Sequence, residues 1–574
     1  MTSRTGADLI VATLKARGVE RVFALCGGHI MPIWMALDAA GIEIVDVRDE
    51  RAAVYMAHAH AAVGGGFGVA LVTAGPGVTN AMTGIANAHV SRMPVLVLSG
   101  TPPRPQENRG ALQDMGHVAL VQSITRVART VRHAHSLPRE LDNAISAALG
   151  HGGEPGPCFL DFPVDVQREP IPEVLFGIEQ VAGRPQPRAR ALEEDLDAAA
   201  VLLRSAQKPV VISGRGANGA SDALARFLTV SGAGYLDTGE SKGIVPDSHA
   251  AHIGAMRGVA MKDADLVITV GRKLDFQLAY GSPAVFGGAK FLRISDVPQE
   301  LTDNRLGDVA LMGHIPQTLD ALSDRLEGDV MNRDWTIALR ERHVQRTAGL
   351  ADALATAPSD AQGRIHPNRL LGEIRKRLDP DAIVIADGGD FPSFSRIALS
   401  SATYLDPGPL GCIGLATPFT IGAAKAAPGR QVVAATGDGA FGFSGMEIDT
   451  AVRHKVPLMI VVSNNGSWAI EVRDQMERFG KSVGTELQFA DYAAMARGFG
   501  LKAWRIEDED AIAPALDAAF AAMKEGHPVL IDAVTSPEAA SSDSKTGLAW
   551  VPDLQALAAW DEAERSWLSS EVNS

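Results

Sequence analysis

The sequence predicts an α/β protein of three domains, in which parallel sheets are flanked by helices. The chain has 574 residues, which is more than one hydrophobic core usually organises. Its composition, 46% hydrophobic and 21% charged, is that of a globular α/β protein. Short apolar runs alternate with helix-like stretches, as in parallel sheets that are buried on both faces. The first and third regions share this rhythm, which predicts two related sheets on either side of a different, Rossmann-like middle domain.

The first domain is expected at residues 1–170. Its candidate strands are short apolar runs at Val22–Leu25, Ile42–Val45, Val69–Val72, Val95–Leu98 and Phe159–Asp161. A proline-rich segment at Glu169–Arg190 contains no such run and predicts a linker.

The middle domain is expected at residues 190–330 and the third domain at 366–540, with a polar separator at Arg346–His366. Candidate strands of the middle domain are Val210–Ile212, Leu266–Thr269 and Phe291–Ile294. Those of the third domain are Ile383–Ala386, Val432–Ala435, Leu458–Val462 and Val529–Ile531. The tail at 541–574 differs from the rest, because it places Trp550, Trp560 and Trp567 in a polar segment.

Charge and composition exclude several classes of function. The net charge of -15 would repel nucleic acid and anionic membranes, and no basic patch offsets it. No apolar stretch approaches the roughly 20 residues needed to cross a bilayer, and no signal peptide is evident. The three cysteines, Cys26, Cys158 and Cys412, are too few and too dispersed for a disulfide framework. We therefore expect a cytoplasmic protein that binds neither nucleic acid nor membrane.

Two turns at the ends of neighbouring candidate strands indicate a metal site. Gly437-Asp438-Gly439-Ala440 follows one strand, and Asn464-Asn465-Gly466-Ser467 follows the next. Each turn alone is common in proteins. Together they bring a carboxylate and an amide oxygen to the carboxyl edge of one sheet, where open α/β sheets bind ligands. Magnesium prefers such oxygen ligands, and glycines let the backbone approach a phosphate.

The spacing of these two turns resembles the diphosphate and magnesium motif of thiamine-diphosphate-dependent enzymes. The resemblance implies thiamine diphosphate and Mg as cofactors. It gives Asp438, the Asn465 side chain and the Ser467 carbonyl as metal ligands, with Gly437, Gly439 and Ala440 at the diphosphate. It also assigns Gly389 to a turn that contacts the diphosphate. Several relatives carry an amide where this chain has Asp390, so no role is assigned to that carboxylate.

The resemblance places an activating acid in the first domain. Thiamine chemistry needs a carboxylic acid that tautomerises the aminopyrimidine ring of the cofactor, and Glu50 stands where the family carries it. The alternative is a glutamate that only stabilises a helix N-terminus. By the same resemblance, Ile413 is the apolar wedge that bends the cofactor and Gly411 is the carbonyl acceptor for its amino group. An ordinary core isoleucine is the alternative for Ile413.

Two further residues are expected beside the substrate. His29 follows the first strand at the start of a helix, where the positive helix end keeps an imidazole neutral. A structural histidine is the alternative. Gln113 matches a glutamine of acetolactate synthases and 2-hydroxyacyl-CoA lyases. Its neutral amide can orient a carbonyl without supplying a proton, which suits reversible ligation better than decarboxylation.

The branch of the family is indicated by two stretches. Phe441–Glu447 resembles 2-hydroxyacyl-CoA lyases and oxalyl-CoA decarboxylases, whereas Asn464–Trp468, together with His29, Glu50 and Gln113, resembles benzaldehyde lyase. Both groups imply a lyase or carboligase that acts on a 2-hydroxy carbonyl compound. We favour a 2-hydroxyacyl-CoA lyase, whose products are formyl-CoA and an aldehyde or ketone. An acetolactate synthase, a benzaldehyde lyase-type carboligase and a non-catalytic homologue are the alternatives.

Other expectations concern partners. The tail could fold over a long ligand as a lid, or dock on a neighbouring subunit. The turns Gly214-Arg215-Gly216 and Gly271-Arg272-Lys273 resemble the domain that holds ADP or FAD in some relatives, although many leave it empty. Because the family grips the two ends of its cofactor with different subunits, the resemblance also implies a homodimer or homotetramer.

Overall fold

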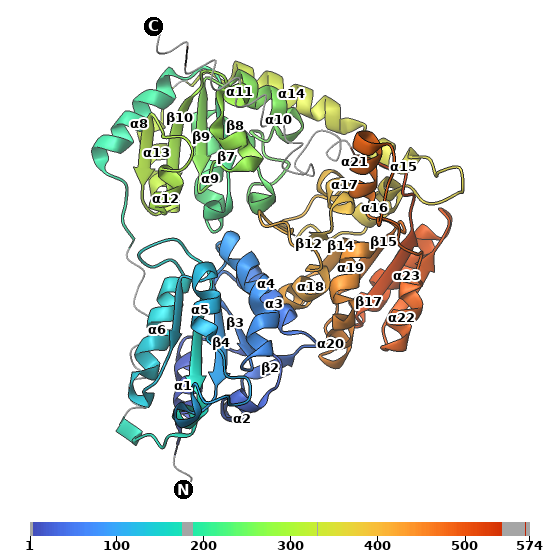
Figure 1. Ribbon diagram of the computed structural model, residues 1–574. Helices are drawn as coiled ribbons and strands as arrows, with labels where there is room; N and C mark the ends of the chain where they lie inside the picture. Colours follow the sequence, from blue (N-terminus) through green and yellow to red (C-terminus); the bar gives the residue numbers. More distant parts are fainter. Residues whose placement is uncertain (1–3, 175–187, 330, 542–568, 570–574) are drawn as a thin grey trace.

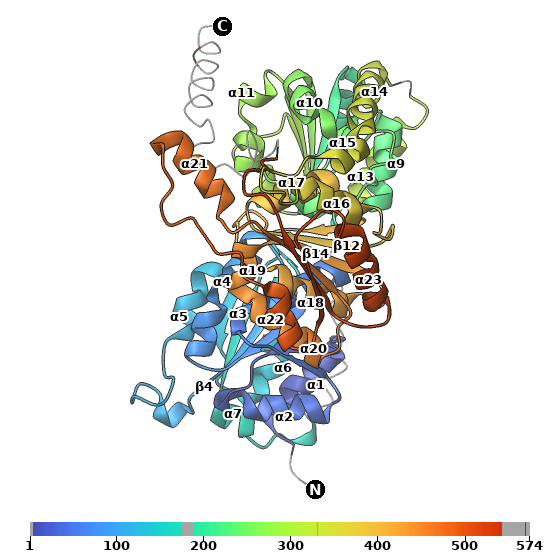
Figure 2. The same cartoon turned by 90° about the vertical axis from the view of Figure 1, so that its right-hand side faces the viewer.

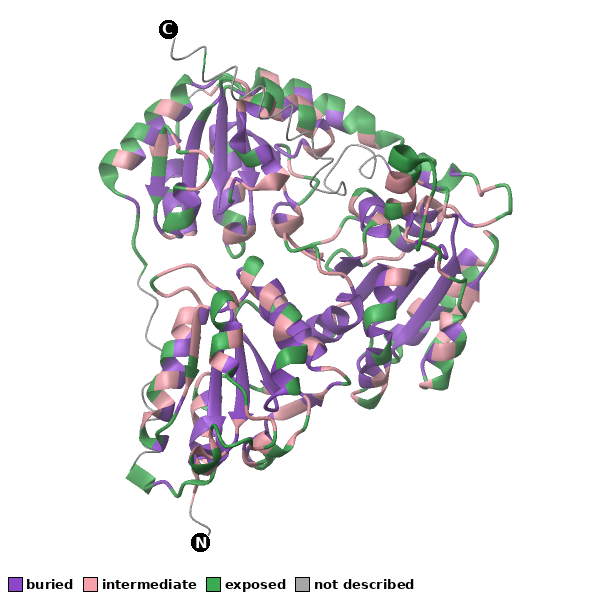
Figure 3. Cartoon of the chain, in the orientation of Figure 1, coloured by how far each residue is buried: buried purple, intermediate pink, exposed green. Residues whose placement is uncertain are grey.

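The computed structural model describes residues 4–174, 188–329, 331–541 and 569 (Figure 1). Three sheets, in which every strand pair is parallel, are flanked by helices, so the predicted fold class is confirmed. Strands are buried and the outer faces of the helices are exposed (Figure 3). Among these residues no helix is long and apolar enough to cross a membrane. The predicted lid at 541–574 falls outside the described residues, apart from Ser541 and Ser569.

The first sheet has the strand order β2-β1-β3-β4-β6-β5. Its strands are β1 (Arg21–Ala24), β2 (Glu43–Asp46), β3 (Gly68–Val72), β4 (Val95–Thr101), β5 (Val127–Thr130) and β6 (Cys158–Pro163). The helices are α1 (Gly6–Ala16), α2 (Met31–Ala39), α3 (Glu50–Gly64), α4 (Pro76–Val90), α5 (His117–Val121), α6 (Leu137–Ala148) and α7 (Val164–Arg168).

The middle sheet has the order β11-β10-β9-β7-β8. Its strands are β7 (Pro209–Ser213), β8 (Gly234–Leu236), β9 (Leu266–Val270), β10 (Lys290–Ser295) and β11 (Val309–Met312). The helices are α8 (Glu193–Ser205), α9 (Ser221–Ser231), α10 (Arg257–Asp263), α11 (Pro283–Phe286), α12 (Pro298–Leu301) and α13 (Ile315–Leu326). Two further helices follow, α14 (Asp334–Ala348) and α15 (Leu350–Thr356), so the polar separator expected from residue 346 is partly helical.

The third sheet has the order β13-β12-β14-β15-β17-β16, which repeats the order of the first sheet strand for strand. Its strands are β12 (Ile383–Asp387), β13 (Thr403–Leu405), β14 (Val432–Gly437), β15 (Met459–Asn464), β16 (Lys502–Ile506) and β17 (Val529–Val534). The helices are α16 (Pro367–Arg375), α17 (Asp390–Ala398), α18 (Ala416–Ala426), α19 (Asp438–Ser444), α20 (Ile448–Arg453), α21 (Ala469–Phe479), α22 (Tyr492–Gly498) and α23 (Ile512–Lys524).

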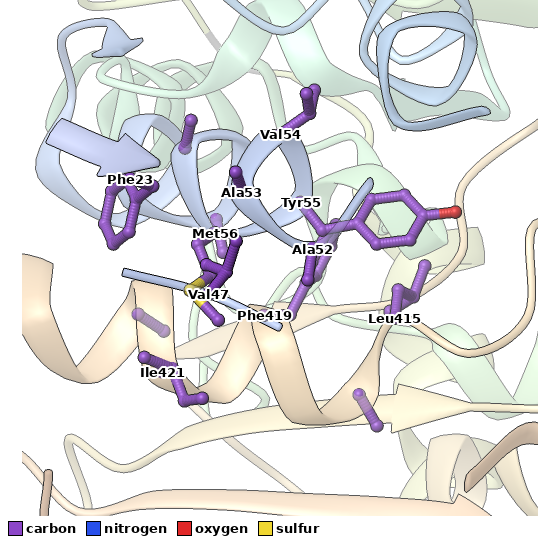
Figure 4. Packing of buried hydrophobic residues seen from close by; sticks show 14 of the residues in the cluster. Phe23, Val47, Ala52, Ala53, Val54, Tyr55, Met56, Leu415, Phe419 and Ile421 are labelled. Carbon is purple, nitrogen blue, oxygen red and sulfur yellow. The ribbon is translucent and has the colours of Figure 1, made fainter. Parts of the chain in front are cut away.

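The first and third domains share one hydrophobic core, because α3 packs across α18 in both views (Figures 1 and 2). A Cβ atom added at Gly422 would lie 2.2 Å from the carbonyl oxygen of Met56, so the two helix backbones nearly touch. Beside this crossing the rings of Tyr55 and Phe419 meet edge to face at 5.9 Å (Figure 4). The helix that begins with Glu50 is therefore fixed to the third domain of its own chain.

Candidate functional site

Three neighbouring strands of the third sheet end at one edge and present the predicted cofactor turns there. Asp387 of β12 is paired with Thr436 of β14, and Gly437 of β14 with Ser463 of β15. The connection from β12 runs to β13 on one side, while β14 lies on the other. This reversal is the position at which open α/β sheets bind ligands. The turns that carry Gly389, Asp438 and Asn465 all follow these strand ends.

Asp438 joins the two motif turns directly. It is the first residue of α19 and is only 2% exposed. One carboxylate oxygen accepts a hydrogen bond from the N–H of Gly439 at 3.0 Å, and the other accepts from the N–H of Gly466 at 2.8 Å. Burial, and to a smaller extent nearby Asp532, raise the pKa of Asp438 to about 6, although the backbone N–H groups oppose the shift. A buried carboxylate with a second carboxylate nearby favours a bound cation.

Asn465 and Ser467 lie in the turn that Asp438 contacts. The Asn465 side-chain oxygen accepts from the Ser467 N–H at 3.0 Å. A Cβ atom at Gly439 would lie 2.4 Å from the ring of Trp468, so only glycine fits between the two turns. A carboxylate, an amide oxygen and a main-chain carbonyl are the oxygen donors that Mg²⁺ prefers. The residues present therefore fit a magnesium-bound diphosphate.

Asp387, for which no role was predicted, holds the segment that contains Gly411 and Ile413. Its buried carboxylate accepts from the N–H groups of Gly388 at 2.7 Å, Gly414 at 3.1 Å and Ala416 at 2.8 Å. Burial raises the pKa of Asp387 to about 6. Gly411 has a φ of +69° and Ile413 is half-buried. The signal for Asp387 was available, since an aspartate closes a strand that is otherwise wholly apolar.

Asp390 begins α17, directly after Gly389, and is paired with Arg473 of α21. Burial raises the pKa of Asp390, and the Arg473 guanidinium opposes that rise. The carboxylate left without a role by the sequence is thus neutralised within its own domain. A Cβ atom at Gly389 would lie 2.6 Å from the Ile470 side chain, so the turn packs closely against the start of α21.

Glu50 lies at the corresponding edge of the first sheet. It is the first residue of α3 and is only 6% exposed. Its carboxylate accepts from the Asn80 amide of α4 at 3.0 Å. A Cβ atom at Gly77 would lie 3.4 Å from the other carboxylate oxygen. Within one chain, Glu50 is therefore held by the first domain and Asp438 by the third.

His29 and Gln113 come together at this edge. Burial lowers the pKa of His29, and a hydrogen bond that Gln113 accepts from the ring opposes this shift. The pKa shift has the expected direction, but burial is its main cause rather than a helix end. The His29 Nδ1 atom is buried without a hydrogen-bond partner among the described residues, which does not fit a fully satisfied structural histidine. Gln113 itself has a φ of +62°.

The turns of the middle domain are used for packing. A Cβ atom at Gly216 would lie 2.7 Å from the Cα of Gly271, so the two glycine turns lie against each other. Arg272 is buried and donates to Glu240 and Asp275, each at 2.8 Å. These contacts account for both glycines and for Arg272 without a nucleotide.

A second group of residues whose side chains can bind metal ions lies after β8. One ligand atom each from Asp237, Asp247 and His252 lie within 4.8 Å of one another. Burial alone would raise the pKa of Asp237, but nearby His252 and the charges of Lys242 and Arg257 lower it. The group is therefore already supplied with positive charge by the protein.

The two related domains and the turns at their sheet edges are those of the class of enzymes that use thiamine diphosphate. Sequence models of thiamine pyrophosphate enzymes match the chain in order: the N-terminal TPP binding domain at residues 4–120, the central domain at 196–322 and the C-terminal TPP binding domain at 387–533. The chain belongs to this family and is a thiamine-diphosphate-dependent enzyme.

Similar proteins span nearly the whole chain. The 2-hydroxyacyl-CoA lyase 2 of Bos taurus is 31% identical, over 92% of this chain and 90% of its own. A probable acetolactate synthase of Mycobacterium bovis is 33% identical, over 93% of this chain and 96% of its own. The 2-hydroxyacyl-CoA lyase of Oryza sativa is 28% identical, over 94% and 97% respectively.

Proposed function

We propose that this enzyme is a magnesium-dependent carbon–carbon lyase and ligase for 2-hydroxyacyl-CoA esters, which it cleaves to formyl-CoA and an aldehyde or ketone. The observation that carries the proposal is the pair of His29 and Gln113, an imidazole with a lowered pKa next to a carboxamide, at the edge that holds Glu50. Neither side chain brings a negative charge that would repel a carbonyl oxygen. The lyases named among the similar proteins support the same chemistry.

The residues of the third-domain edge would hold the cofactor. Asp438, the Asn465 side chain and the Ser467 carbonyl would bind Mg²⁺, and the turns at Gly389 and Gly437–Ala440 would bind the diphosphate. Gly411 and Ile413 would face the rings. When bound, thiamine diphosphate supplies an electron sink for the bond next to a carbonyl.

Three residues of the first domain would act on protons and orientation. Glu50 would hold a proton at the aminopyrimidine ring. His29 would accept the proton of the substrate 2-hydroxyl as that carbon becomes a carbonyl, and return it in the ligation direction. Gln113 would donate a hydrogen bond to the thioester carbonyl and keep it in place.

The proposal includes a homodimer, or a tetramer built from it, in which Glu50 of one subunit completes the site of Asp438 of another. Large apolar side chains are exposed in the segments next to both halves of the site. Leu112, beside Gln113, is 78% exposed, and Phe443, on the helix that starts at Asp438, is 48% exposed. Such side chains are typical of surfaces that another subunit covers.

Acetolactate synthesis is the second candidate, because a relative of that name is 33% identical. It predicts release of carbon dioxide from pyruvate, and a yellow protein if the middle domain holds FAD. The packing of Gly216 on Gly271 and the pairing of Arg272 give that domain no need of a nucleotide.

The test is incubation with thiamine diphosphate, Mg²⁺ and a panel of 2-hydroxyacyl-CoA esters, benzoin and pyruvate, with products identified by mass spectrometry. We expect formyl-CoA and the matching aldehyde or ketone from at least one ester. Glu50→Gln should abolish the products while still binding the cofactor, since Gln can accept from Asn80 as Glu50 does. No turnover of any ester, with acetolactate formed from pyruvate, would overturn the proposal.

A further inference from the structure

A buried chain of hydrogen bonds runs from the first sheet to the turn after β3. The Gly75 N–H donates to His117 Nε2 at 2.8 Å, and His117 Nδ1 lies 3.2 Å from a carboxylate oxygen of Asp161. The His117 side chain is fully buried, and Asp161 lies in β6. A backbone N–H can only donate, so Nε2 must be the acceptor and carries no proton. The single imidazole proton is therefore on Nδ1, directed at Asp161.

The far end of this chain fixes the position of Gln113. Gly75 has a φ of +62°, the left-handed region that favours glycine, and directly precedes α4. A Cβ atom at Gly75 would lie 2.9 Å from Cβ and 3.2 Å from Cα of Gln113. Gln113 also has a φ of +62°. Because they pack so closely, a shift of the Gly75 turn would displace Gln113, and a shift of Gln113 would displace the turn.

The same turn touches the remaining site residues of the first domain. A Cβ atom at Gly27, two residues before His29, would lie 2.3 Å from the Cβ of Thr73. At the other end of the turn, Gly77 is the residue that packs against the Glu50 carboxylate. Displacement of residues 73–77 would consequently move Glu50, Gln113 and the His29 loop relative to one another.

We infer that His117, oriented by Asp161, is a positioning residue of the reaction: it holds the 73–77 turn, and through it Gln113 and the partner of Gln113, His29. The inference rests on the proposed function in so far as His29 and Gln113 face the substrate. His117 itself is buried and exchanges no proton in the reaction. Its role is to keep the turn within the narrow tolerance that productive orientation requires.

The first test is independent of activity. Protein labelled with ¹⁵N-histidine would be examined by solid-state NMR, with the His117 signal identified by its loss in His117→Gln. We expect a neutral ring with a protonated Nδ1 and an unprotonated Nε2. A ring protonated on Nε2, or charged at neutral pH, would overturn the inference. An enzyme that cleaves no 2-hydroxyacyl-CoA ester would refute the proposed function and leave this result standing.

The second test compares His117→Gln with His117→Leu on whichever substrate the wild type turns over. A glutamine offers one acceptor and one donor, whereas leucine offers neither. We expect His117→Leu to lower kcat by about 100-fold, the cost of a misplacement near 1 Å, with cofactor affinity and KM almost unchanged. His117→Gln should recover most of kcat and keep the shape of the wild-type pH profile.

Two results of the second test would contradict the inference. One is a kcat for His117→Leu equal to that of the wild type. The other is a loss in His117→Leu that is matched by lost cofactor binding and a lower melting temperature and is not recovered by His117→Gln, since that would show a merely structural role.

Discussion

Glu447 of the third domain accepts a hydrogen bond from the backbone N–H of Arg48, two residues before Glu50, at 2.9 Å. Its other carboxylate oxygen accepts from Thr450 at 2.7 Å. Nearby, Arg51 donates to the carbonyl of Phe443 at 2.9 Å. The start of the helix that carries Glu50 is thus tied to the segment that follows Asp438 in the same chain. A change in either segment is expected to reach the other.

The buried carboxylate of Glu447 is expected to make the stability of the protein depend on pH. Burial raises its pKa from 4.5 to about 7, so the folded protein holds the proton more tightly than the unfolded chain. The resulting stability is fully present below the unfolded pKa and is lost as pH rises through the folded pKa. Glu447→Gln lacks this dependence. As the pH rises from about 5.5 to about 8.5, the free energy of unfolding of Glu447→Gln should increase by about 2 kcal/mol relative to that of the wild type.

Chemical denaturation of the wild type and Glu447→Gln at both pH values measures this difference. Asp387 and Asp438 also have raised pKa values, but they are common to both proteins and cancel in the comparison. A difference in stability that does not change with pH would show that Glu447 is ionised in the folded protein throughout.

Asp438→Asn tests the metal ligand. Asparagine carries no charge and can accept from only one of Gly439 and Gly466, so Mg²⁺ affinity should fall and the contact between the two turns should weaken. We expect cofactor affinity in the presence of Mg²⁺ to drop about 100-fold, by analogy with the loss of one strong charge-assisted contact. Titration calorimetry measures it, with the exposed Asp517→Asn as control. Unchanged affinity would remove Asp438 from the metal site.

Gly439→Ala tests the close approach of the two turns. The added methyl would lie 2.4 Å from the Trp468 ring, whereas a Cβ atom at Gly442 of the same helix would meet nothing within 4 Å. We expect Gly439→Ala to cost about 1–3 kcal/mol and to weaken cofactor binding. Gly442→Ala should do neither. Equal melting temperatures and affinities for the two variants would mean that the turns are not packed as described.

Central strands were predictable from the sequence and edge strands mostly were not. Every predicted apolar run lies on a strand, but β5, β8, β11, β13 and β16 were missed, and each lies at the edge of its sheet. A central parallel strand is buried on both faces and appears as an unbroken apolar run, whereas an edge strand such as Lys502–Ile506 mixes charged and apolar residues. β2 is the edge strand that was found, whereas β11 was missed although all four of its residues, Val309–Met312, are apolar.

Local motifs likewise predicted the two turns expected to bind the cofactor, but not the residues that hold those turns in place. Gly437–Ala440 and Asn464–Ser467 are short and self-contained, so their spacing could be compared directly with a family. The residues missed are acceptors of hydrogen bonds from backbone N–H groups of distant segments: Asp387, Glu447 and His117. The sequence around each residue does not indicate which backbone group is its partner. Their roles follow only from the tertiary structure.

We propose that Glu50 of one subunit and Asp438 of another form one site. Co-expression of Glu50→Gln with Asp438→Asn tests this pairing, with activity of the mixed protein assayed at a cofactor concentration that saturates the wild type but leaves each variant alone inactive. If the residues come from different subunits, each hybrid dimer has one intact site, and random pairing should restore about a quarter of wild-type activity. If both residues of a site came from one subunit, every site would carry a substitution, and the mixture would stay inactive.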